Sequence, residues 1–125
     1  MKQMLFAALL ALLASCTTMA QTAPRQDGVA RLGETTYVDG PLVTPLSVIE
    51  DSRCPIDVQC IWAGRVILHV RVSGHSTLDL TLGEPQQVAD GTLTLVSVMP
   101  DQVARVNQEI DPADYRFGFE FNGGF

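Results

Sequence analysis

The stretch Val66-Ile67-Leu68-His69-Val70-Arg71-Val72 decides the fold class of this chain. Every second residue from Val66 to Val72 is aliphatic and would point to one side of an extended strand. This period of two is typical of a β-strand with one buried face. We expect the strand to run from Ile61 to Val72, which makes it the longest of the chain.

Shorter alternating runs lie on both sides of this strand, and residues typical of turns separate them about every ten positions. No segment has the i, i+3, i+4, i+7 spacing of an amphipathic helix. The last run carries aromatic residues on one face, so we expect it in the middle of the core. The sequence therefore predicts an all-β fold, either an antiparallel β-sandwich of the Greek-key or immunoglobulin-like type or a small barrel. The other expected strands are Thr35–Val38, Val43–Glu50, Thr77–Leu82, Thr92–Val98 and Tyr115–Phe121.

Two places in these strands predict local irregularities, and a third predicts the register of a hairpin. Pro45 lacks an N–H group and favours an edge position or a bulge. The apolar phase changes after Leu95, which a β-bulge or a strand buried on both sides would explain. Residues on opposed strands share a face, and a hairpin loop of residues 74–76 that pairs Arg71 with Asp79 satisfies this rule.

The run Asp111-Pro112-Ala113-Asp114-Tyr115 resembles the tyrosine corner of immunoglobulin-like domains. There the tyrosine hydroxyl bonds back to the preceding connection. Phe117 stands where immunoglobulins carry a cysteine. The two carboxylates of this run fit turn formation better than acid–base catalysis.

An apolar segment near the N-terminus ends at Cys16. Lys2 precedes a run of Leu, Phe and Ala over residues 5–13, which is too short to span a bilayer. The residues Leu13-Ala14-Ser15-Cys16 resemble the lipobox of bacterial lipoproteins, in which the cysteine becomes the lipidated first residue of the mature protein. We therefore expect a cleaved signal helix over residues 1–15, a lipidated flexible tether over 16–31 and a single β-domain over 32–125.

This resemblance implies export and a lipid anchor in the cell envelope. In a Gram-negative host, Thr17 after the cysteine favours the outer membrane, facing the periplasm. The mature chain keeps seven arginines and no lysine against fourteen acidic residues, a formal charge of −7. This charge argues against nucleic acid as a partner and against electrostatic docking on anionic lipid, which leaves the lipid anchor as the expected membrane contact.

With Cys16 acylated, Cys54 and Cys60 remain as an even pair in an oxidising compartment, so we expect a disulfide between them. A redox pair is an alternative, although the spacing differs from the Cys-x-x-Cys of redox motifs. A second alternative is a copper or zinc site made by the two thiolates with His69 or His75. We expect no cofactor.

The densest group of unusual residues surrounds these cysteines. Asp51-Ser52-Arg53-Cys54-Pro55, Cys60 and Trp62-Ala63-Gly64 resemble a signature of small bacterial exported proteins and lipoproteins of unknown function. The resemblance continues through residues 82–85 and ends at residues 115–117. It covers most of the mature domain and implies no activity.

Within this segment we expect a disulfide-closed loop that exposes a candidate binding surface, made of Asp51, Arg53, Asp57 and Trp62. Arg53 would pair with one of the two aspartates, and Trp62 would pack over the disulfide. Gly64 would let the chain bend or another backbone approach. Glu50, Asp51 and Asp57 do not have the alternating oxygen ligands of a calcium loop.

No motif in the chain points to catalysis. Ser52 and Ser73 have no nucleophile-elbow context, and no Gly-rich phosphate loop leads from a strand into a helix. We therefore expect a non-enzymatic envelope lipoprotein that presents its loop to a protein or glycan partner. The alternatives are an inhibitor of a periplasmic hydrolase and a thiol or metal protein that uses Cys54 and Cys60.

Overall fold

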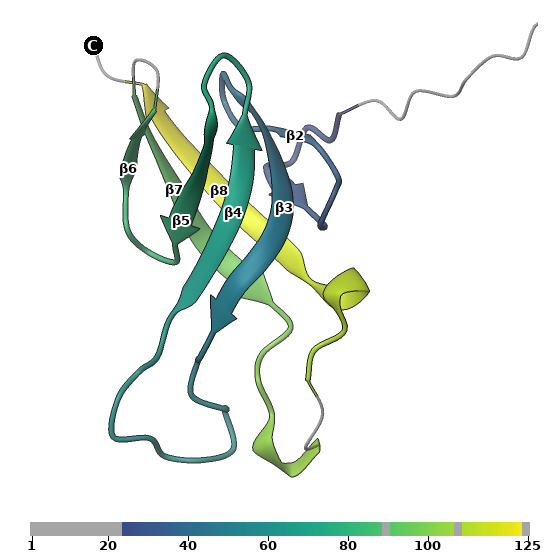
Figure 1. Cartoon of the computed structure of the whole chain (residues 1–125), viewed down its shortest axis with the longest axis vertical. Coiled ribbons are helices and arrows are strands. Elements are labelled where there is room, and N and C mark those ends of the chain that lie inside the picture. Colours follow the sequence, from purple (N-terminus) through teal and green to yellow (C-terminus); the bar gives the residue numbers. More distant parts are fainter. Residues whose placement is uncertain (1–23, 89–90, 107–108, 124–125) are drawn as a thin grey trace, which may run out of the picture.

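The computed structural model describes residues 24–88, 91–106 and 109–123, which form an antiparallel β-sandwich. The expected all-β fold is therefore confirmed (Figure 1). The expected signal peptide, the acylated Cys16 and the first part of the tether lie outside the described residues.

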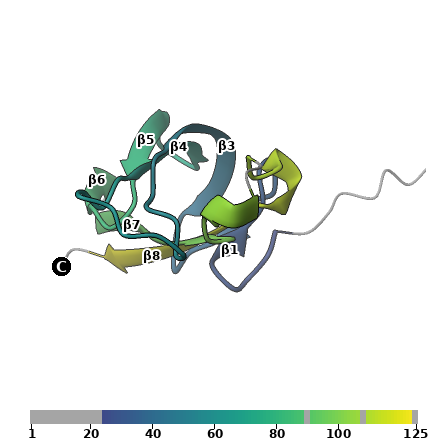
Figure 2. The same ribbon diagram turned by 90° about the horizontal axis from the view of Figure 1, so that it is seen from below.

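Two four-stranded sheets make the sandwich, and Figure 2 shows them from below as two layers. One sheet has the order β1-β8-β7-β6 and the other the order β2-β3-β4-β5. Consecutive strands are neighbours from β2 to β5 and from β6 to β8, whereas β1 pairs with β8, the last strand of the chain. The strands are β1 Val29–Ala30, β2 Thr36–Tyr37, β3 Leu42–Asp51, β4 Val66–Val72, β5 Thr77–Thr81, β6 Gln86–Val88, β7 Gly91–Met99 and β8 Arg116–Gly123.

The core lies between the two sheets and consists of the inward side chains of alternating positions. In β4 every second residue from Val66 to Val72 is buried, as the alternation predicts. Phe117 and Phe119 of β8 are buried opposite them, which confirms the central position expected for the aromatic strand. The other buried core side chains are Val38, Val43, Leu80, Val88, Leu93, Leu95, Val98 and Tyr115.

Both expected irregularities of the strands are β-bulges. The pairing of β3 with β4 shifts after Pro45 and again after Val48. The pairing of β7 with β8 shifts after Leu95, so Val96 is exposed while Val98 still reaches the core. A bulge adds one residue to one strand and restores the inward phase beyond it.

The register expected for the β4–β5 hairpin is wrong by two residues. His69, not Arg71, pairs with Asp79, and Arg71 pairs with Thr77. The two strands are joined by residues 73–76, where Gly74 has a φ of 71°. Shifting a hairpin by two residues keeps each side chain on its face, so the face rule does not distinguish the two registers.

The strand expected over Ile61–Val72 begins only at Val66, because the five residues before it belong to the loop after β3. The domain also begins earlier than the expected Leu32. Val29 and Ala30 pair with Gly118 and Phe117 of β8, and the Ala30 side chain is buried. This part of the expected tether is therefore an edge strand of the sandwich.

Two long connections leave the same end of the sandwich (Figure 1). The β3–β4 loop comprises residues 52–65 and joins two strands of one sheet. The β7–β8 connection comprises residues 100–115 and contains two short 3₁₀ turns, η1 Ala104–Val106 and η2 Pro112–Asp114. This end of the fold carries all four residues of the candidate binding surface.

Candidate functional site

The β3–β4 loop is closed by the expected disulfide between Cys54 and Cys60. Their Cα atoms are 5.9 Å apart, within the range usual for a disulfide. The base of the loop is held by Ser52 and Arg65, whose backbones are joined by an N–H to carbonyl bond of 2.8 Å. The Arg65 N–H also donates to the Ser52 hydroxyl over 3.0 Å. The loop therefore has a fixed base and a covalently closed end.

Gly64 allows the two sides of this base to approach each other. It has a φ of 69°, and a Cβ atom built on it would overlap with the carbonyl of Ser52. The sequence predicts both uses of this glycine, a bend and a close backbone approach.

Asp51 and Arg53 come together, as one of the two expected pairings of Arg53 requires. Arg53 Nε and Nη2 donate to the two carboxylate oxygens of Asp51 over 2.8 and 2.9 Å. The pair is largely buried, because only 7% of the Asp51 side chain and 14% of the Arg53 side chain are exposed. Such a bidentate geometry is the strong form of an arginine–carboxylate interaction.

The same guanidinium group also joins the loop to the opposite sheet. Arg53 Nη1 donates to the carbonyl of Val98 and Nη2 to the carbonyl of Pro100, each over 3.0 Å. The hydroxyl of Tyr115 donates to Asp51 Oδ2 over 2.8 Å. Burial raises the pKa of Asp51, but the hydrogen bonds from Arg53 and Tyr115 outweigh it, so the pKa is lowered overall.

Tyr115 differs from the expected tyrosine corner. Asp111 does form the local turn, because its carboxylate accepts the N–H of Ala113 over 2.9 Å at the start of η2. The Tyr115 hydroxyl, however, bonds to Asp51 of the other sheet and not to the preceding connection. Asp51 is a charged acceptor, and charged acceptors form stronger hydrogen bonds than backbone carbonyls do.

Asp57 does not pair with Arg53 and instead joins the two long connections. Its carboxylate accepts the N–H groups of Ala104 and Arg105 over 2.8 and 3.0 Å at the start of η1. These hydrogen bonds, first that from Arg105 and then that from Ala104, lower the pKa of Asp57. The N–H of Ile56 also donates to the carbonyl of Gln102 over 2.9 Å. The disulfide loop is thus fixed to the neighbouring connection at two adjacent residues.

Trp62 does not occupy a core position over the disulfide. Its exposed fraction is 71%, and that of Ile61 beside it is 96%. Trp62 follows the disulfide loop on the outer part of the β3–β4 loop, whereas the tryptophan of an immunoglobulin core lies on a strand inside the sandwich. The expectation that it packs as in that core is therefore wrong.

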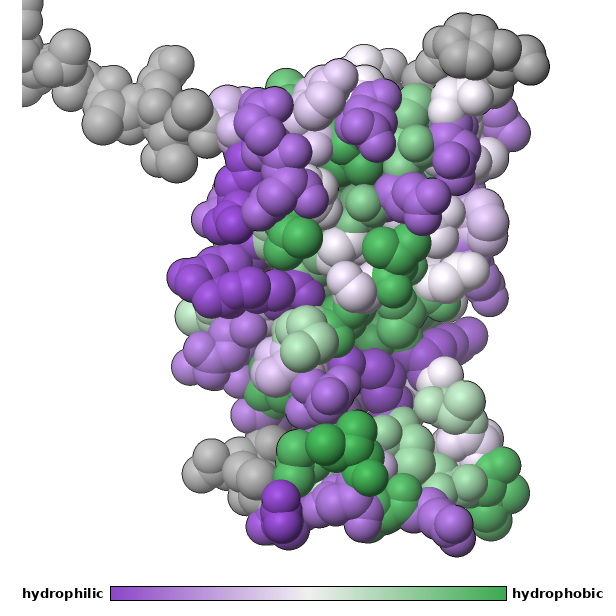
Figure 3. Space-filling view, turned by 180° about the vertical axis from the view of Figure 1, so that it is seen from behind, coloured by the Kyte–Doolittle hydropathy of each residue, from purple (hydrophilic) through white to green (hydrophobic). Residues whose placement is uncertain are grey.

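These two residues belong to an exposed apolar group that we call the apolar tip, made of Ile56, Val58, Ile61 and Trp62. Eight large hydrophobic residues are exposed in the described part of the chain, and these four lie within seven consecutive positions. Figure 3 shows hydrophobic residues gathered at the lower end of the molecule, where the two long connections lie. Single exposed hydrophobic residues are common, but a contiguous group marks an interaction site.

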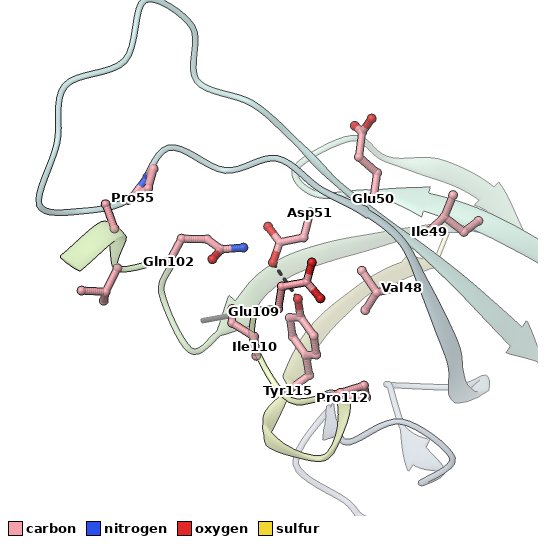
Figure 4. A pocket seen from close by; sticks show the side chains of 12 residues that line it. Val48, Ile49, Glu50, Asp51, Pro55, Gln102, Glu109, Ile110, Pro112 and Tyr115 are labelled. Carbon is pink, nitrogen blue, oxygen red and sulfur yellow. Dashed lines mark hydrogen bonds between the residues drawn. The ribbon is translucent and has the colours of Figure 1, made fainter. Parts of the chain in front are cut away.

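A cavity of about 760 Å³ lies beside the disulfide loop. Residues 48–51 of β3 form one side of it, and residues 102–104, 109, 110, 112 and 115 of the β7–β8 connection form the other. Pro55 of the disulfide loop also lines it (Figure 4). Its walls come from segments far apart in the sequence, and no local pattern predicted it.

The residues considered for metal binding do not converge. Glu50 pairs with Arg65 on the surface, Asp51 with Arg53, and Asp57 with backbone N–H groups. His69 Nδ1 lies 2.6 Å from Asp79 Oδ1 on the neighbouring strand. Among the described residues, no three His, Cys, Asp or Glu side chains form a group able to hold a metal ion.

The two serines considered for catalysis have structural partners. The Ser52 hydroxyl binds the backbone of Arg65, and the Ser73 hydroxyl accepts the N–H of Leu42 over 2.8 Å.

Within residues 24–88, 91–106 and 109–123, no helix is long and apolar enough to cross a membrane. Comparison of the chain with protein-family models, curated proteins and solved structures found no match.

Proposed function

We propose that this protein is a non-enzymatic lipoprotein of the bacterial cell envelope that binds a protein partner through its disulfide loop. The observation that carries this proposal is the apolar tip, four exposed hydrophobic side chains on seven consecutive residues. Protein interfaces have a buried apolar centre in which tryptophan is often the residue of highest energetic weight. We expect Trp62 to have this role.

The rigidity of the loop supports the same proposal. The disulfide, the Ser52–Arg65 base and the Asp57 contacts restrain the loop at three places. A loop that is ordered before binding loses less conformational entropy when a partner covers it, so more of the contact energy contributes to affinity. The loop lies on a stable sandwich, which is a common arrangement for recognition loops.

Site-specific photo-crosslinking in the native host tests the proposal. A photoreactive residue at Ile61, which is 96% exposed, should give a discrete crosslinked product, and Trp62→Ala should abolish it. The matched control is the same photoreactive residue at His75, which is exposed in the hairpin turn at the other end of β4. Equal crosslinking from both positions, or a product unaffected by Trp62→Ala, would contradict the proposal. If the partner is a glycan, no crosslinked protein should form from Ile61. Variants of the loop should then bind envelope glycan more weakly than the unchanged protein does.

The lipid anchor is tested separately. Cys16→Ser should move the protein from the membrane fraction to the soluble periplasmic fraction and should abolish metabolic labelling with a fatty acid. The full chain with Cys16 intact is the control. An unchanged membrane fraction of the Cys16→Ser protein would refute lipidation.

A thiol or metal function predicts a different state of Cys54 and Cys60. In the proposed binding module, the intact mass of the isolated protein corresponds to one disulfide and no metal, and it increases by two hydrogen masses after reduction. Reduced cysteines that retain copper or zinc would overturn the proposal in favour of a metal protein.

A further inference from the structure

The lining of the cavity beside the disulfide loop is both apolar and acidic. Twelve residues line it, of which three are acidic and none is basic. Ile49 and Ile110 are among its apolar residues. The volume of about 760 Å³ lies within the range of pockets that hold small ligands or a few side chains.

The three acidic residues differ in how their charge is balanced. Glu50 pairs with Arg65, and Asp51 is held by Arg53. None of the ion pairs formed among the described residues involves Glu109. In Figure 4 the Glu109 carboxylate lies in the cavity on the same side as the Tyr115 hydroxyl. Glu109 therefore brings an unbalanced negative charge to this cavity.

The Tyr115 hydroxyl adds a hydrogen-bond acceptor at the same place. Its proton is donated to Asp51, so the lone pairs of its oxygen remain for a donor that enters the cavity. An anion in the cavity would meet the Glu109 charge, and no basic residue lines the cavity. A cation with several N–H donors complements both groups.

The cavity lining and the apolar tip meet at two consecutive residues of the disulfide loop. Pro55 lines the cavity and directly follows Cys54, while Ile56 next to it belongs to the apolar tip. A partner that covers Ile56 would thus lie beside the cavity.

We propose that the cavity receives a lysine or arginine side chain of the protein that covers the apolar tip, with its cationic group beside Glu109 and the Tyr115 hydroxyl. Apolar residues next to that side chain would pack on Ile49 and Ile110. The inference rests on the proposed function and adds the chemistry of the partner, a basic residue flanked by apolar ones.

Short labelled peptides test this chemistry directly. Fluorescein-labelled Gly-Ile-Arg-Ile-Gly, Gly-Ile-Gln-Ile-Gly and Gly-Ile-Glu-Ile-Gly are titrated with the full-length protein in detergent, and binding is measured by fluorescence anisotropy. The Arg peptide should bind, whereas the Gln and Glu peptides should bind at least about tenfold more weakly, because they lack the charged contact.

The Glu109→Gln variant locates the contact. It should weaken binding of the Arg peptide about tenfold and leave the Gln peptide unaffected. The matched control is Glu120→Gln, an exposed acidic residue of β8 outside the cavity lining, which should change binding less than twofold. Equal binding of the three peptides, or an Arg peptide that binds Glu109→Gln as well as the unchanged protein, would overturn the inference.

The outcome separates this inference from the proposed function. If crosslinking from Ile61 persists while the peptides show no preference for arginine, the inference is wrong and the proposed function stands. If the Arg peptide binds through Glu109 while Ile61 gives no crosslink, the cavity site stands without the proposed partner at the apolar tip.

Discussion

The hydroxyl of Tyr115 donates a 2.8 Å hydrogen bond to Oδ2 of Asp51, a residue 64 positions earlier that lies on the other sheet. Asp51 ends β3, and Tyr115 immediately precedes β8. Arg53 binds the same carboxylate and two carbonyls at the end of β7. The two sheets are therefore joined by a polar network at the end where the apolar tip and the cavity lie.

Loss of the Arg53 side chain should destabilise the protein strongly. Arg53→Met leaves the buried Asp51 carboxylate without its cation, and breaking one side of a buried ion pair costs about 3–5 kcal/mol. The control is Arg65→Met, which removes the exposed pair with Glu50 and should lower the midpoint far less, because solvent screens an exposed pair. Urea denaturation followed by circular dichroism measures both. Equal midpoints for the two variants would mean that the Asp51–Arg53 pair contributes little.

Two glycines with the same backbone conformation should respond differently to substitution. Gly64 and Gly74 have φ values of 69° and 71°, but only at Gly64 would a Cβ atom overlap with another backbone segment. Gly74→Ala should cost about 1 kcal/mol through its left-handed conformation alone. Gly64→Ala should cost at least about 3 kcal/mol, because the base of the loop must also open. Thermal unfolding of the two variants tests the difference, and similar melting temperatures would contradict it.

Tyr115 should titrate at unusually high pH. Burial and then the hydrogen bond to Asp51 raise its pKa from 10.0 to about 12. Tyr37 is the only other tyrosine, so in a Tyr37→Phe variant the ultraviolet absorbance of tyrosinate reports Tyr115 alone. A midpoint near 10 in the folded protein would show that Tyr115 is neither buried nor bonded to Asp51 in solution.

The same pKa shift predicts a loss of stability in alkaline solution. The raised pKa favours the protonated tyrosine in the folded state, so its contribution is fully present below pH 10 and is lost as the pH rises from 10 towards about 12. The free energy of unfolding of Tyr115→Phe should therefore fall less over this interval than that of the unchanged protein. Parallel curves for the two proteins would refute the assignment.

Removal of the disulfide should weaken the fold without abolishing it. In the chain-entropy description, a closed loop this short contributes about 2.4 kcal/mol. The Cys54→Ser/Cys60→Ser variant should lose about this amount and remain folded, because the base of the loop and the Asp57 contacts persist. Denaturation of the variant and of the reduced parent protein should agree. Complete unfolding of the variant would show that these contacts do not suffice.

Sequence periodicity predicted the parts of the fold that depend on alternation. The burial of every second residue in β4, the aromatic face of β8 and the bulge after Leu95 all follow from which residues are apolar. The β4–β5 register does not, because alternation with a period of two is satisfied by any even shift. Turn geometry at residues 73–76 decides between these registers, and the apolar pattern does not contain it.

The candidate site could be predicted only where its contacts are local. The disulfide, the Asp51–Arg53 pair and the turn at Asp111 join residues close in sequence, and all were expected in some form. The bond from Tyr115 to Asp51 and the role of Asp57 at η1 join distant segments, so the sequence did not indicate them. The apolar pattern predicts a strand position for Ile61, whereas the structure exposes both Ile61 and Trp62 on the loop.

The first described residues pair with both layers of the sandwich. Arg25 bridges to Thr36 of β2, while Val29 and Ala30 pair with β8. If the protein is tethered through Cys16 as proposed, a pulling force on the tether would act first on these residues. The force would then be transmitted to both sheets. The hydrogen bonds at these pairings would bear the strain first, because they lie closest to the tether along the chain.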